Sequence, residues 1–78
     1  MNSNVINIDN EILNGTPVFL GTRVPIISLF WHLQNGVSID NFLEDFPTVK
    51  KEQVFELLGI IEKIFSQKQF KTIYENIA

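Results

Sequence analysis

The spacing of apolar residues divides the chain into a short N-terminal part with β periodicity and a longer part with helical periodicity. In the N-terminal part, within residues 5–9, the apolar residues Ile6 and Ile8 alternate with the polar residues Asn7 and Asp9. This alternation predicts a short strand whose buried face carries Ile6 and Ile8. Asn14-Gly15 follows as a turn signal.

A stretch rich in glycine and proline separates the two parts. Pro17 and Pro25 fix their own φ and favour extended backbone at the residue before each of them. Gly21 supplies the positive φ that a tight turn requires. The segments on either side of it, residues 17–20 and 22–24, therefore predict a small β-hairpin that leads directly into a helix.

Three segments with apolar residues at helical spacing follow the hairpin. The first begins at about residue 26 and ends at Gly36, and the second extends from its cap Ser38 to Pro47. The third begins around residues 49–51 and carries a core stripe of five residues: Val54, Leu57, Leu58, Ile61 and Phe65. Three helices joined by brief turns, the middle one short, are typical of a helix-turn-helix unit.

These elements predict a single domain, residues 1–78, of the α+β class and mostly α. Residues 1–4 are expected to be frayed, and residues 5–25 to form the β-hairpin region. Residues 26–65 form the three-helix helix-turn-helix bundle, and residues 66–78 a C-terminal helical extension. A chain of this size buries only about 60–65% of its unfolded surface, so oligomerisation or a permanent partner is expected.

The helical extension carries a second apolar stripe: Phe70, Ile73, Tyr74 and Ile77. In a continuous helix this stripe would lie opposite the core stripe of the third helix, because each residue turns the helix by about 100°. Either the helix breaks within residues 66–69, or the second stripe serves another surface. Both a fold-back onto the bundle and a contact with a second copy or a partner satisfy this pattern.

Composition and charge narrow the classes of function. The chain has 9 acidic and 6 basic residues and a net charge of −3, which argues against a free-standing, strongly basic nucleic-acid binder. It has no cysteine, and therefore no disulfide framework or thiolate metal site. The longest apolar run is too short to cross a membrane, so a cytoplasmic location is expected.

The sequence contains no recognisable set of catalytic residues. His32 is the single histidine, and a structural role on its helix is the simpler interpretation. Gly15 and Gly21 are too far apart for a phosphate-binding loop and lack the lysine and hydroxyl residue that follow in such loops. No nucleophile, base and orienting group come together. The protein is predicted not to be an enzyme and to use no cofactor or metal.

Support for DNA binding is mixed. Lys50 and Lys51 stand at the start of the third helix, which would be the reading helix, and Gln53 could reach a base edge. Glu52 and Glu56 would repel phosphates from the same helix, and the lysines could instead balance these acids. DNA binding would therefore require a dimer with two reading helices, or added charge from a partner.

Arg23 also has two interpretations. Its structural role would be to pair with a carboxylate such as Asp9 or Asp45, or to cap carbonyl groups beside the hairpin. Its functional role would be to enter an acidic pocket of a partner or to hold a phosphate, since the guanidinium group suits both. The structural role is favoured at this point.

Several short motifs occur in a characteristic order: Ile8-Asp9, Asn14-Gly15-Thr16-Pro17-Val18, Gly21-Thr22-Arg23-Val24-Pro25, Leu33, Gly36-Val37-Ser38 and Phe46-Pro47. In this order they resemble the domain-of-unknown-function family four-three-three, a VapB-type, antitoxin-like family of small bacterial and archaeal proteins. The resemblance covers about residues 5–61. The chain departs from the family pattern at Asn14, Thr16 and Lys50-Lys51.

The resemblance implies an antitoxin that neutralises a PIN-like ribonuclease toxin by direct binding and represses its own operon, often as a homodimer. PIN-like active sites are clusters of carboxylates, so the basic residues Arg23, Lys68 and Lys71 are candidates to enter one. The apolar stripe, Phe70, Ile73, Tyr74 and Ile77, is the candidate for further partner contact. A stand-alone helix-turn-helix regulator and a dimeric interaction module without DNA binding are the alternatives.

Overall fold

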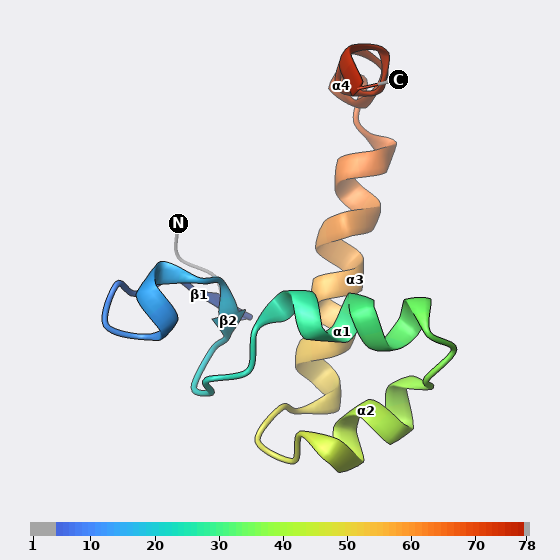
Figure 1. Cartoon of the computed structure of the whole chain (residues 1–78). Helices are drawn as coiled ribbons and strands as arrows, with labels where there is room; N and C mark the ends of the chain where they lie inside the picture. The colour runs from blue at the N-terminus through green and yellow to red at the C-terminus, as the bar shows by residue number, and fades with distance from the viewer. Residues whose placement is uncertain (1–4, 78) are drawn as a thin grey trace.

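The fold is described from a computed structural model, which describes residues 5–77; the expected fraying of residues 1–4 lies outside that range. The described residues form a mostly helical α+β structure, which confirms the predicted class. In chain order its elements are β1 (Ile6–Asn7), the 3-10 turn η1 (Leu13–Gly15), β2 (Val18–Phe19), α1 (Ile26–Gln34), α2 (Ile39–Asp45), α3 (Lys51–Ser66) and α4 (Gln69–Ile77) (Figure 1).

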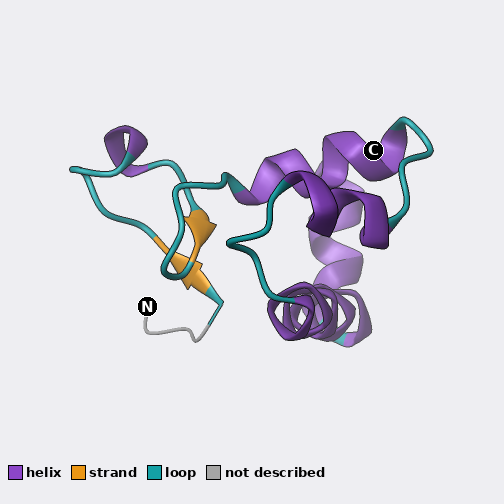
Figure 2. Cartoon of the chain, turned by 90° about the horizontal axis from the view of Figure 1, so that it is seen from below, coloured by secondary structure: helices purple, strands orange, loops and turns teal. Residues whose placement is uncertain are grey.

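β2 is the middle segment of a minimal sheet. On one side it pairs antiparallel with β1, with Ile6 opposite Phe19. On the other side the predicted hairpin forms as a single bridge between Val18 and Pro25, and the Phe19 amide donates to the Val24 carbonyl at 3.0 Å. The strands lie beside the helices (Figure 2), so the N-terminal region is part of the same packed unit.

The turn of this hairpin is closed by Gly21 and Thr22. Gly21 has φ +80°, a conformation that residues with a Cβ rarely adopt. The Thr22 hydroxyl is buried, donates to the Phe19 carbonyl at 2.8 Å and accepts from the Val24 amide at 3.0 Å. Both arms of the turn are thus held by one side chain, while the next residue, Arg23, is exposed.

The helix boundaries follow the predicted signals. Helix α1 begins after Pro25, and Gly36, at φ +80°, lies in the turn that follows its end. The Ser38 hydroxyl caps α2 by accepting from the Asn41 amide at 3.1 Å, and α2 ends just before Pro47. Helix α3 begins at Lys51, the last residue of the predicted interval 49–51.

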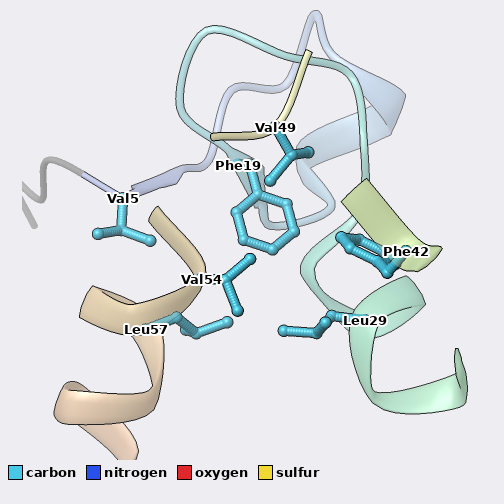
Figure 3. Packing of buried hydrophobic residues seen from close by; sticks show 7 residues of the cluster. All are labelled: Val5, Phe19, Leu29, Phe42, Val49, Val54 and Leu57. Atoms are coloured by element: carbon cyan, nitrogen blue, oxygen red, sulfur yellow. The ribbon is translucent and has the colours of Figure 1, made fainter. Parts of the chain in front are cut away.

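The hydrophobic core lies where the hairpin meets the three helices (Figure 3). The rings of Phe19 and Phe42 are in contact, with their centroids 6.2 Å apart. The buried cluster draws side chains from β2, from α1, α2 and α3, and from the residues before β1 and before α3: Val5, Phe19, Leu29, Phe42, Val49, Val54 and Leu57. Because Val5 and Phe19 come from the N-terminal region, the helices do not complete the core by themselves.

Two predicted core positions are wrong. Ile8 is 65% exposed, whereas Val5 is buried, because β1 ends at Asn7 and the alternation does not extend beyond it. Phe65 is 60% exposed, because α3 projects well past α1 and α2 (Figure 1). The first half of α3 packs in the core, and its last turns extend out of the bundle.

The helical extension separates from α3 at a break within the predicted interval. Gln67 has ψ 147°, which is extended backbone, and the preceding Ser66 hydroxyl donates to the Lys63 carbonyl at 3.0 Å. Helix α4 then runs across the end of α3, away from the hairpin, α1 and α2 (Figure 1). The Phe65 and Phe70 rings meet at this corner, with centroids 4.5 Å apart. The fold-back onto the bundle therefore does not form.

Replacing Thr22 by valine should lower the free energy of unfolding by about 1–3 kcal/mol, because the buried Phe19 carbonyl loses its side-chain donor and the partly buried Val24 amide loses its acceptor. The matched control is Thr16→Val. Thr16 makes the same kind of bond, from its hydroxyl to the carbonyl three residues earlier at 2.8 Å, but at an exposed site. Urea denaturation monitored by circular dichroism measures both variants. Equal losses would show that the Thr22 hydroxyl has no special role.

Candidate functional site

The two lysines predicted to contact DNA are exposed at the N-terminal end of α3. The Lys51 ammonium lies 3.6 Å from an Asp40 carboxylate oxygen and 5.7 Å from the centre of the Phe55 ring. Both charged side chains of this ion pair are largely solvent-exposed, so the pair stabilises the protein by at most about 1 kcal/mol. An interaction this weak leaves Lys51 available to a stronger anion.

Gln53, the third predicted DNA contact, is half-buried and its side chain makes two hydrogen bonds within the protein. Its side-chain oxygen accepts from the Lys50 amide at 3.0 Å, and its side-chain nitrogen donates to the Leu20 carbonyl at 2.9 Å. The first bond satisfies an amide at the start of α3 that lacks a helical partner. The second ties α3 to the hairpin. Contact with a base edge would require both bonds to break, so its observed role is structural.

Arg23 is exposed beside this tether, on the residue that follows the turn. Its expected ion pair with Asp9 or Asp45 does not form: within residues 5–77 the guanidinium has no carboxylate partner. Asp9 instead accepts a hydrogen bond from the Glu11 amide at 2.9 Å, within its own turn. The ion pair predicted for Arg23 is therefore not observed within residues 5–77.

An open groove of about 520 Å³ lies next to Arg23, between the hairpin and the loop that joins α2 to α3. It is lined by Asn7, Ile12, Gly21, Thr22, Arg23, Val24 and Thr48. Thr48 was not among the predicted site residues. Its position depends on a contact between segments distant in sequence, and no local pattern signals it.

His32 has the structural role that its isolation suggested. Its Nδ1 donates to the Ser28 carbonyl at 2.6 Å. Its ring lies edge-on to Phe42 and Phe46, with centroid distances of 5.2 and 5.4 Å. The imidazole therefore fills the interface between α1 and α2.

The C-terminal arm, defined as residues 64–77, is the second candidate surface. Of its large apolar side chains all but Phe70 are exposed: Ile64, Phe65, Ile73, Tyr74 and Ile77. Lys68 and Lys71 line an open groove of about 510 Å³ together with Phe65, Gln67, Phe70 and Tyr74. The predicted partner-binding residues thus lie together on the arm, except Arg23, which lies near the opposite end of α3.

The arm also differs in charge from the rest of the chain. It carries two lysines and one glutamate, whereas residues 1–63 carry four basic and eight acidic residues. A cationic, apolar segment therefore extends from an acidic domain.

The described part of the chain offers no group of three or more histidine, cysteine, aspartate or glutamate side chains placed to hold a metal ion. Among the helices of residues 5–77, none combines the length and the apolar character needed to span a bilayer.

Residues 6–59 match the family described as "Protein of unknown function (DUF433)", and the chain belongs to this family. The match covers the hairpin, the bundle and the first half of α3, and it ends before the C-terminal arm. The recognisable motifs therefore coincide with the packed domain.

A curated relative is the uncharacterized protein y4eO of Sinorhizobium fredii, which is 34% identical over 50 residues. The aligned stretch is 64% of this chain and 23% of the relative, so the chain spans less than a quarter of that protein's length. No solved structure matches the chain.

Replacing Gln53 by alanine should lower the free energy of unfolding by about 1–3 kcal/mol, because two hydrogen bonds are lost together. Gln34→Ala is the matched control, since Gln34 is an exposed glutamine on α1. Hydrogen exchange of the Lys50 amide gives a local readout and should accelerate in Gln53→Ala alone. Unchanged stability and exchange would contradict the tether.

Proposed function

We propose that this protein is the antitoxin of a type II toxin–antitoxin pair, which neutralises a PIN-like ribonuclease toxin by direct binding and represses its own operon. The observation that carries the proposal is the C-terminal arm. It lies outside the family domain, exposes its apolar residues and is cationic in an acidic chain. Exposed apolar surface of this kind marks sites of protein–protein contact.

The positive charge of the arm suits a partner with an acidic surface. A PIN-like active site is a cluster of carboxylates, and Lys68 and Lys71 could each supply a cation to such a cluster. The neighbouring aromatic residues, Phe70 and Tyr74, would provide the apolar contacts that dominate binding energy at protein interfaces. An arm that reaches the active site would block the RNA substrate directly.

The opposite end of the molecule is proposed to bind the operator. Helices α2 and α3 are consecutive and joined by a short loop, which suits a helix-turn-helix arrangement with α3 as the reading helix. Lys50 and Lys51 lie at the end of α3 that enters the major groove in such proteins. Because this end and the arm are separated by the length of α3 (Figure 1), toxin and DNA would bind without overlap.

The most direct experiment is co-expression of the chain with the product of the neighbouring gene. The proposal predicts that the neighbouring product alone arrests growth, that the chain relieves the arrest, and that the two copurify. If the neighbouring product is harmless or forms no complex, the antitoxin proposal fails. Operator binding without any such complex would favour the stand-alone regulator instead.

Reversing both charges of the arm, in Lys68→Glu/Lys71→Glu, should weaken toxin binding about tenfold or more, because cations facing carboxylates become anions. The control with the same charge change is Lys50→Glu/Lys51→Glu. It should retain toxin binding and lose DNA binding. Calorimetric titration against the purified toxin measures the first effect, and equal toxin affinity in both variants would contradict the proposed role of the arm.

A further inference from the structure

Of the four basic residues in positions 1–63, Lys50 and Lys51 lie at the start of α3. A third, Arg23, is distant in sequence but lines a groove with Thr48, two residues before Lys50. Lys50 and Lys51 flank the start of the helix itself, and Arg23 lies on the hairpin turn beside it. The Gln53 side chain connects the two segments through its bonds to the Lys50 amide and the Leu20 carbonyl. In Figure 1 the turn after β2 lies next to the loop that precedes α3.

From this juxtaposition we propose that Arg23 binds a backbone phosphate of DNA, with Thr48 across the groove as a second hydrogen-bond donor. The hairpin turn would then contact the DNA backbone beside the major groove that α3 enters. This inference rests on the proposed operator binding and extends it to a segment outside the helices. It assigns a ligand to the single arginine of the chain.

The turn is built to present a cation. The Gly21 conformation and the two bonds of the Thr22 hydroxyl fix the backbone on the N-terminal side of Arg23. The Val24 carbonyl, on its C-terminal side, accepts from the Phe19 amide. Only the arginine side chain must be ordered on binding, which keeps the entropic cost of the contact small. Its planar guanidinium can donate two parallel hydrogen bonds to one phosphate.

Acidic residues near the start of α3 offset part of the positive charge there, so Arg23 matters for attracting a phosphate. Lys51 is near Asp40, and Glu52 is exposed on the following residue. Within residues 5–77 Arg23 has no carboxylate partner, so its charge is not offset by a contact. Because α3 carries Glu52, Glu56 and Glu62, attraction of DNA to this helix requires a positive charge from another part of the structure. Arg23 on the hairpin supplies that charge.

Fluorescence anisotropy with two labelled duplexes, one spanning the region upstream of the gene and one of unrelated sequence, tests the inference. For wild type, Arg23→Ala, Arg23→Lys and Lys63→Ala, the binding constant is measured as a function of salt. Each phosphate contact contributes about 0.9 to the slope of the logarithmic plot. We expect Arg23→Ala to lose about that amount per protomer, and Arg23→Lys and Lys63→Ala to keep the wild-type slope.

Circular dichroism and thermal midpoints of the variants should match those of the wild type, since Arg23 and Lys63 are both exposed. A wild-type slope in Arg23→Ala would overturn the inference while leaving operator binding intact. If Arg23→Ala weakens toxin binding and leaves the slope unchanged, Arg23 belongs to the toxin interface and the inference is equally overturned. If the wild-type chain binds neither duplex, proposed operator binding fails, and this inference fails with it.

Discussion

The hydrogen-bonded turn at Gly21 and Thr22 is the constraint on which the rest of the structure depends. The turn directs Phe19 into the core, where its ring meets Phe42. It also presents the Leu20 carbonyl to the Gln53 side chain at the start of α3. A sheet of this size is only marginally stable alone in water. The packing of Phe19 in the core and the hydrogen-bonded turn therefore stabilise one another. The Gly-Thr-Arg sequence therefore has three distinct physical functions: backbone freedom, closure of the turn and an outward cation.

This construction separates the molecule into a packed domain and a projecting arm. The family match ends near the point where α3 leaves the bundle. Within the C-terminal arm, all the large apolar side chains except Phe70 are exposed. A small domain has little hydrophobic stabilisation to spare, so exposed apolar residues on the arm favour a partner over a purely internal role. The two proposed binding activities are assigned to opposite ends of α3 for this reason.

Most of the fold could be predicted from local patterns. Ser38, Gly36 and Pro47 act within a turn of their own position, so the limits of α1 and α2 followed from residue types alone. Ile8 and Phe65 were misplaced because burial depends on where neighbouring elements end, and the period of a single segment does not contain that information. The break at Gln67 lacked a glycine or proline to locate it.

The candidate site was less predictable than the fold. Lys50 and Lys51 lie at the start of α3 as expected. The Gln53 side chain, however, donates a hydrogen bond to the carbonyl of Leu20, which is 33 positions away in the sequence. Within residues 5–77 Arg23 has no carboxylate partner and lies in the same groove as Thr48. Both features likewise result from tertiary packing. Pairings of this kind become visible only when the hairpin and α3 are placed together.

Native mass spectrometry of the chain mixed with the neighbouring gene product and upstream DNA tests the central claim most directly. Binding at opposite ends of α3 predicts a ternary complex whose mass contains all three components. Complexes in which toxin and DNA replace each other, or the absence of either binary complex, would contradict the account.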